Sequence, residues 1–270
     1  MLKSDAVFAG SIPENYDRFM VPLIFAPYAE DMAHRATARA PGAVLEIAAG
    51  TGVLTRALAP RLAPEAHYAV TDLNQPMLDF AAWRQGADPR IRWQQADAMA
   101  LPFDDGRFDV VCCQFGAMFF PDRVVAFGEA RRVLKPGGLF VFSTWDRIEE
   151  NDFADEVTNV LADVFPQDPP RFMARTPHGY HDTDQIRADL AAAGYGGVTI
   201  ATIAAQSHAA SARAAALAYC QGTLLRTEIE ARDAGKLEAA TDLAEAAIAR
   251  RHGSGAIAGK IQAHVVEALA

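Results

Sequence analysis

One short segment, residues 44–52 with the sequence VLEIAAGTG, combines an apolar run, an acidic residue and two glycines. The apolar run is typical of a buried β-strand. Gly50 and Gly52 follow it, and glycine permits positive φ and lets a ligand approach the backbone closely. Leucines at helical spacing over 53–62 then predict a helix whose free N–H groups point at the turn. This order can form a pocket for a nucleotide-like ligand.

The glycine turn by itself leaves two interpretations open. Gly50 and Gly52 are two positions apart, but position 55 is Thr, so a GxGxxG motif is incomplete. Two nearby glycines after an apolar strand also make an ordinary strand-to-helix turn, and short glycine motifs have many false positives. The surrounding residues must decide.

Two aspartates follow later apolar segments. Asp72 lies 72 − 50 = 22 positions after Gly50, where a carboxylate can accept both hydroxyls of a ribose. Its alternative is a charge at a helix start. Asp97 can accept the exocyclic amine of adenine while Ala98 donates its N–H, or it can cap an Asx turn.

Strand and helix patterns alternate through the first half of the chain. Such alternation predicts a doubly wound parallel sheet with right-handed crossovers, in which ligands bind beyond the carboxyl ends of the strands. We expect strands over 44–48, 66–73, 91–97, 108–115 and 139–145, and helices over 27–40, 53–62, 76–85 and after Pro121.

The remaining segments are less regular. We expect an irregular arm over 1–26, a loop or short-helix insertion over 146–181, and a helix capped by Asp182 or Thr183. We also expect a strand over 196–204, one or two alanine-rich helices over 209–251 and a last strand over 260–270.

The motifs E-x-A-x-G-T-G, TDLN, QADAMALPFDDGRFDVV and LKPGGLFVFSTW together resemble the class I S-adenosylmethionine-dependent methyltransferases. The likeness is strongest to the small-molecule group that includes ubiquinone and menaquinone biosynthesis methyltransferases, and covers about 40–145. It implies a seven-stranded, mostly parallel, Rossmann-like α/β sheet with an antiparallel last strand and helical lid insertions. The expected parts of this one structural domain are an arm and helix (1–40), a cofactor-binding core (41–145), an insertion with helix and strand six (146–208), a helical lid (209–252) and the final strand (253–270).

The resemblance also implies cofactor-binding residues for S-adenosyl-L-methionine, with S-adenosyl-L-homocysteine as product. Ala48 stands where the family usually has the first glycine of its loop, and backbone contacts survive that change. By resemblance, the methionine portion is held by Glu46, Ala48, Ala49, Gly50, Thr51, Gly52 and Gln114, the ribose by Asp72, and the adenine by Leu73, Met77, Asp97 and Ala98.

The methyl group would pass to a small organic acceptor by in-line displacement, without a metal. Candidate catalytic residues are His178, His181 and Tyr16, with exposed loop histidines and arm packing as the alternatives. Candidate acceptor-binding residues are Phe25, Tyr180 and Tyr219, which could equally be core.

Bulk composition narrows the function class. A formal charge of 25 − 34 = −9 argues against a nucleic-acid partner. We expect a cytoplasmic protein without a membrane span. The three cysteines lack CxxC spacing, and the sequence contains neither a signal-like run nor a stretch of ~18 apolar residues. The oligomeric state stays open. An NAD(P)-dependent oxidoreductase or a non-catalytic cofactor-binding protein are the alternative functions.

Overall fold

The chain is described by a computed structural model for residue 14 and residues 16–270. Its centre is one seven-stranded sheet in the order β3-β2-β1-β4-β5-β7-β6. Neighbouring strands are parallel except β7, which lies between β5 and β6 and is antiparallel to both. The expected fold class is therefore confirmed. The strands are β1 (Ala43–Glu46), β2 (His67–Asp72), β3 (Ile91–Gln95), β4 (Phe108–Gln114), β5 (Leu134–Trp145), β6 (Gly196–Ala209) and β7 (Ile257–Leu269).

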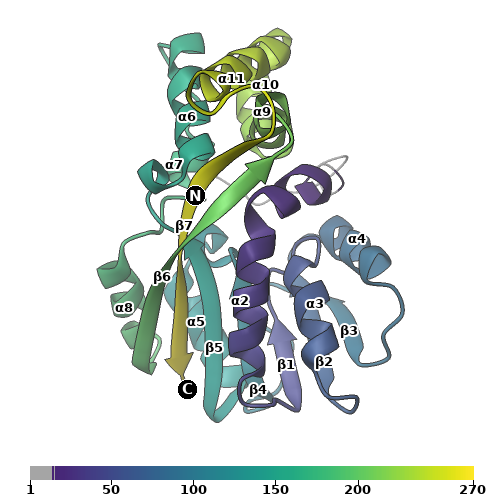
Figure 1. Cartoon of the computed structure of the whole chain (residues 1–270). Coiled ribbons are helices and arrows are strands. Elements are labelled where there is room, and N and C mark those ends of the chain that lie inside the picture. Colours follow the sequence, from purple (N-terminus) through teal and green to yellow (C-terminus); the bar gives the residue numbers. More distant parts are fainter. Residues whose placement is uncertain (1–13, 15) are drawn as a thin grey trace.

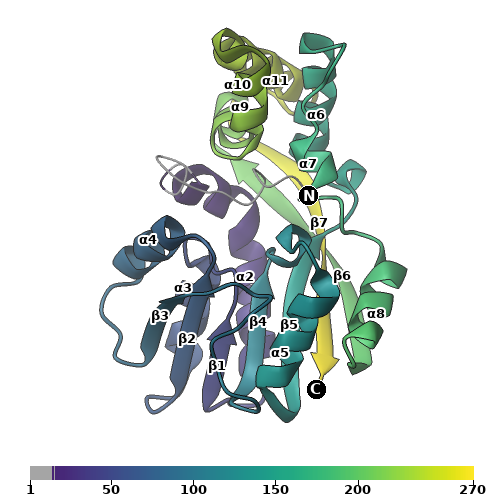
Figure 2. The same ribbon diagram turned by 180° about the vertical axis from the view of Figure 1, so that it is seen from behind.

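Helices cover both faces of this sheet. In Figure 1, α2 (Ala26–Thr37) and α3 (Val53–Leu58) lie in front of it, and Figure 2 shows α5 (Arg123–Val133) and α8 (Thr183–Ala192) on the opposite face. Helix α4 (Gln75–Gln85) follows β2. Asp122 caps α5 by accepting from the Val125 N–H, and Asp182 caps α8, so sequence-local hydrogen bonds fix where these helices begin.

The expected irregular arm over 1–26 is wrong for its second part, while residues 1–13 and 15 lie outside the described residues. A π-helix, η2, runs over Tyr16–Phe25 and includes Pro22. Proline has no N–H to donate, and wider π-type turns are one way for a helix to adapt locally. Met20, Leu23 and Ile24 of this segment are buried, so tertiary packing overrides the proline signal.

The second half of the chain contains more helix than expected. Residues 146–181 include the 13-residue helix α6 (Asp152–Val164) and the short α7 (Phe172–Arg175), and 209–251 holds α9 (Ala212–Gln221), α10 (Leu225–Asp233) and α11 (Leu237–His252). These helices gather beyond one end of the sheet (Figure 1). None of the helices in the described part of the chain is long and apolar enough to cross a membrane.

Strands β6 and β7 are also longer than expected. They pair as far as Ala209 with Ile257, whereas β5 and β7 pair only as far as Trp145 with Ala263. A two-stranded ribbon therefore projects past the sheet and carries the helices α9–α11 (Figures 1 and 2). Strand β5 begins at Leu134, earlier than the expected start at residue 139, so LKPGG lies within this strand.

The loop after β1 contains an unusual alanine. Ala48 has φ 53°, in the left-handed region that favours glycine. Its Cβ faces Gly116, where an added Cβ would lie 2.5 Å from the Ala48 Cβ and 2.8 Å from Cys113 Sγ. Gly116 thus leaves room for the methyl group of Ala48.

We expect Gly116→Ala to lower the free energy of unfolding by about 1–3 kcal/mol, because it overpacks this contact. The double variant with Ala48→Gly should recover about 1 kcal/mol of that loss, since one of the two clashes disappears and the left-handed strain is released. Urea unfolding of both single variants and the double variant measures the coupling.

Gly128→Ala is the matched control. Gly128 lies inside α5, and nothing lies within 4 Å of an added Cβ, so this variant should gain up to about 1 kcal/mol from helix propensity. Strictly additive effects of Ala48→Gly and Gly116→Ala would contradict the proposed contact.

Candidate functional site

A cavity lies beyond the carboxyl ends of four parallel strands. Its wall is made by the residues that follow β1, β2, β3 and β4, together with η2. Parallel strands bring their carboxyl ends to one edge, which is where open α/β sheets bind ligands. Eleven of the twelve residues implied as cofactor-binding line this cavity: Glu46, Ala48, Ala49, Gly50, Thr51, Asp72, Leu73, Met77, Asp97, Ala98 and Gln114.

The carboxylate of Asp72 joins two of these segments. Its Oδ2 accepts the Gly50 N–H at 2.8 Å, and its Oδ1 accepts the Asn74 N–H at 2.7 Å. Only 6 % of Asp72 is exposed. Burial raises the pKa of this carboxyl, while the hydrogen bonds from Asn74 and Gly50 oppose the rise. The carboxylate is therefore held in one orientation before any ligand arrives.

Glu46 lies beneath the loop that follows β1. Its Oε2 accepts hydrogen bonds from the Tyr68 hydroxyl and, at 2.7 Å, from the Thr55 hydroxyl. Burial raises the pKa of Glu46 to about 7, although these two donors favour the ionised form. Glu46 reaches the cavity wall, and its carboxyl group also connects β1 to β2 and α3.

Two buried oxygens on the cavity wall have no hydrogen-bond partner among the described residues. They are Oγ1 of Thr51 and Oε1 of Gln114. The Gln114 amide is oriented by its own Nε2, which donates to the Phe25 carbonyl at 2.9 Å. Because buried polar atoms are normally satisfied, these two atoms fit a ligand that offers both a donor and an acceptor.

The residues implied for the adenine lie at another part of the wall. Asp97 accepts the Met99 N–H at 2.8 Å through Oδ1, so it forms the Asx turn and also lines the cavity. Met77 is buried and Leu73 is half exposed. Gly52 is not on the wall. An added Cβ there would lie 3.0 Å from the Ala81 Cβ, so Gly52 lets α3 approach α4.

Aromatic side chains form another part of the wall, and sequence reasoning missed most of them. Phe25 and Tyr16 are candidates that the sequence predicts, and their rings stack with centroids 5.1 Å apart. The missed rings are Phe115, Phe119 and Phe120, on the segment with the 3₁₀ turn η4 (Ala117–Phe119). The cluster FGAMFFP directly after β4 was the signal that could have identified them.

Tyr16 is the one catalytic candidate that reaches the cavity. Burial raises the pKa of its phenol, and the nearby charge of Asp72 raises it further. A phenol with a raised pKa stays protonated at neutral pH. Tyr16 can therefore donate a hydrogen bond here but is a poor base.

The two candidate histidines do not line the cavity. His178 is buried against Trp145, with ring centroids 5.9 Å apart, and its Nδ1 lies 2.8 Å from the Asp146 carbonyl. Burial lowers the pKa of His178 to about 4. The expectation of an exposed loop histidine is thus wrong for His178, while His181 is exposed and lies 2.8 Å from the His178 carbonyl through Nδ1.

Tyr180 and Tyr219 are also absent from the cavity wall. The Tyr180 hydroxyl donates to Asp189 at 2.8 Å, and Arg123 lies over its ring at 4.0 Å. Tyr219 is fully buried in α9. Both are packing residues in this structure, because the Tyr180 ring packs against side chains of α5 and α8 and the Tyr219 ring is buried in the core.

Comparison with known proteins agrees with this geometry. Residues 45–142 match the family model described as a methyltransferase domain. A demethylmenaquinone methyltransferase from Thermus thermophilus is 45% identical over 106 residues, covering 38% of this chain and 47% of the relative. A ubiquinone/menaquinone biosynthesis C-methyltransferase from Idiomarina loihiensis is 30% identical over 172 residues, covering 56% and 65%. The chain spans about half the length of the first curated relatives it matches.

Solved structures show the same fold at low sequence identity. A Haemonchus contortus phosphoethanolamine N-methyltransferase, in complex with S-adenosylhomocysteine, aligns with TM-score 0.61 and 15% identity over 95% of this chain and 57% of that one. The Bacillus subtilis YcgJ protein aligns with TM-score 0.58 and 20% identity over 90% and 98%. Residues 45–142 thus match the methyltransferase domain model, and this part of the chain is similar in sequence to ubiquinone and menaquinone biosynthesis methyltransferases.

Proposed function

We propose that this chain transfers the methyl group of S-adenosylmethionine to a small organic acceptor. The observation that carries the proposal is the cavity at the carboxyl edge of the sheet, which is lined by a fixed carboxylate and by two oxygens that have no partner among residues 14 and 16–270. The family membership of residues 45–142 supports it.

The polar groups on the wall suit the parts of the cofactor. Asp72 would accept the ribose hydroxyls, because its position is already fixed by Gly50 and Asn74. Asp97 and Ala98 would contact the adenine between Leu73 and Met77. Gln114 Oε1 would accept from the ammonium of the methionine portion, and the Thr51 hydroxyl would donate to its carboxylate.

The protein contributes to the reaction by aligning the methyl donor with the acceptor and by excluding water. When bound, the cofactor supplies a methyl group already activated on a sulfonium. Ideal alignment of two reactants can contribute about 7–11 kcal/mol. Phe25, Phe115, Phe119 and Phe120 would keep water from the methyl end of the cavity, because their rings form its apolar wall.

None of the three candidate catalytic residues supplies a base on this wall, and the carboxylates of Glu46, Asp72 and Asp97 there already accept hydrogen bonds from the protein. His178 and His181 lie elsewhere, and Tyr16 has a raised pKa. A base is needed only when the nucleophile arrives with a tightly held proton. We therefore infer an acceptor whose nucleophilic atom ionises readily in water or carries a lone pair at neutral pH.

The acceptor itself would enter from the side of the lid helices α6, α7 and α9–α11. The relatives named as demethylmenaquinone and ubiquinone/menaquinone methyltransferases make an aromatic quinol the first acceptor to test, and the ring-lined wall suits a planar apolar molecule. An NAD(P)-dependent oxidoreductase is not favoured, because the third glycine of GxGxxG is missing and the family match is to methyltransferases. A non-catalytic cofactor-binding protein is not favoured for the same family reason.

The test is release of S-adenosylhomocysteine when the protein is mixed with the methyl donor and a series of quinols, phenols and amines. A rise in melting temperature with S-adenosylmethionine, and none with NAD(P)H, is expected. Stabilisation by NADPH alone would contradict the proposal. Binding of the methyl donor without turnover of any acceptor would favour the non-catalytic alternative.

Asp72→Asn should weaken S-adenosylhomocysteine binding about 10- to 100-fold, the range expected for hydrogen bonds to a charged group. Titration calorimetry measures the affinity, and circular dichroism checks the fold. Asp79→Asn on the exposed face of the same region is the control and should bind normally. Equal affinities in both variants would argue against a ribose role for Asp72.

Thr51→Val should weaken cofactor binding without lowering the stability of the ligand-free protein. The hydroxyl of Thr51 is buried without a hydrogen-bond partner in the part of the chain that the structure describes, so its removal should leave the ligand-free protein as stable as before or slightly more stable. Cofactor affinity should fall by about 5- to 10-fold, the value of one hydrogen bond. Loss of stability without ligand, at unchanged affinity, would refute the assignment.

His178→Gln tests whether His178 is a buried neutral residue and not a base. The folded pKa of about 4 lies below the usual 6.5, so the unfolded chain binds more protons between these values. Stability contributed by neutral His178 is complete above pH 6.5 and falls as pH drops toward 4, by on the order of 3 kcal/mol.

His178→Gln should lose less stability than the wild type as the pH falls from 6.5 to 4. Its rate of methyl transfer should stay within about threefold of the wild-type rate. Urea unfolding of both proteins from pH 7 to pH 4 measures the difference, in which the contribution of Glu46 cancels. A 100-fold loss of turnover in a folded variant would restore His178 as a catalytic candidate.

A further inference from the structure

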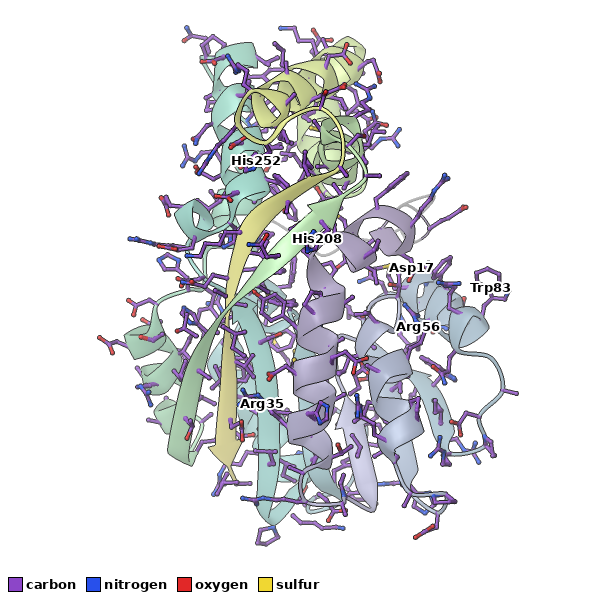
Figure 3. All side chains as sticks on the ribbon, in the orientation of Figure 1. Asp17, Arg35, Arg56, Trp83, His208 and His252 are labelled. Carbon is purple, nitrogen blue, oxygen red and sulfur yellow. The ribbon has the colours of Figure 1, made fainter. Side chains whose placement is uncertain are left out.

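A carboxylate is buried where the arm meets the cofactor-binding half of the fold. Asp17 lies in the first turn of η2, and only 8 % of it is exposed. Removing a charge from water is costly unless the charge is paired. Figure 3 shows Asp17 and Arg56 close together between the arm and α3.

Two arginines from two different helices neutralise this carboxylate. Arg56 of α3 donates to Oδ1 at 2.9 Å, and Arg84 of α4 donates to Oδ2 at 3.1 Å. The Arg56 and Arg84 side chains are 25% and 46% exposed. Each oxygen of Asp17 thus has its own cation, and water screens the pair less than it would on an open surface.

The same arginine also holds the cavity loop. Nη1 of Arg56 donates to the Thr51 carbonyl at 2.6 Å. Thr51 belongs to the turn that lines the cavity. One guanidinium therefore links the arm to the backbone of that turn.

The other end of η2 is tied to the cavity as well. The Phe25 carbonyl accepts from Gln114 Nε2 at 2.9 Å, and the Phe25 and Tyr16 rings line the cavity. The segment Tyr16–Phe25 is therefore fixed at both ends and forms a strap along the cavity, with its two terminal rings on the wall.

We propose that Asp17 is a positioning residue that keeps this strap closed over the cofactor, so that the cofactor and its product exchange only when the contacts with Arg56 and Arg84 break. This inference rests on the proposed function. Asp17 acts through its neighbour Tyr16 and through Arg56, which holds the Thr51 carbonyl. Asp17 itself touches no reacting atom. The Phe25 end, held by an uncharged hydrogen bond next to α2, is the hinge.

The test uses Asp17→Asn, which keeps the shape of the side chain and removes its charge. Dissociation of S-adenosylhomocysteine, followed by displacement with excess S-adenosylmethionine, should be at least tenfold faster than in the wild type. Hydrogen–deuterium exchange of the peptide 16–25 should also accelerate in the ligand-free protein. A merely structural role would lower the melting temperature and leave both rates unchanged in the folded protein.

Arg84→Met is the second variant, because Arg84 is half exposed and does not touch the cavity loop. It should accelerate exchange of 16–25 and ligand dissociation to an intermediate degree. Asp79→Asn, an exposed aspartate on the same helix, should change neither rate. Unchanged dissociation and unchanged exchange in folded Asp17→Asn and Arg84→Met would overturn the proposal.

The failure of the proposed function gives a different result. If the wild type binds no S-adenosylhomocysteine, the cofactor assignment fails. The exchange measurement on the ligand-free variants then still decides whether Asp17 closes the strap, with unaltered protection of 16–25 overturning it and lost protection supporting it.

Discussion

The buried carboxylate of Asp72 is the interaction on which the site depends. It accepts one N–H from the turn after β1 and one from the start of α4, so a single side chain sets the distance between two segments that are far apart in the chain. Each of these N–H groups would otherwise need water or a ligand. The cavity is therefore formed before a ligand binds, because hydrogen bonds between its own wall residues hold it open.

Close packing beneath the cavity imposes a second constraint. Ala48 occupies a left-handed conformation, and Gly116 on the neighbouring strand end leaves the space that its methyl group needs. Gly52 similarly lets α3 approach α4. The glycines of this site thus serve packing as much as ligand approach, since only the absence of a Cβ permits these contacts.

The two halves of the chain have different tasks in this arrangement. The first half builds the parallel strands and the polar wall, and its sequence resembles many relatives over that region. The second half extends β6 and β7 past the sheet and places five helices beyond its edge (Figure 2). The arm η2 contacts both parts, and it supplies rings to the cavity and a charge to α3 and α4.

The sequence by itself predicted the alternating strands and helices of a parallel sheet, because periodicity and caps are local signals. The family resemblance supplied the antiparallel last strand and the eleven residues that the structure places on the cavity wall. The order of the strands came from the structure. Sequence reasoning misassigned His178 and the helical arm, and it missed Phe115, Phe119 and Phe120. Whether a ring lines a cavity or fills a core depends on residues distant in sequence. The tertiary structure alone decided that His178 packs against Trp145 and that Arg56 and Arg84 contact Asp17. It also decided that one oxygen each of Thr51 and Gln114 has no partner among the described residues. Burial and long-range pairing are properties of the packed chain, so no local pattern encodes them.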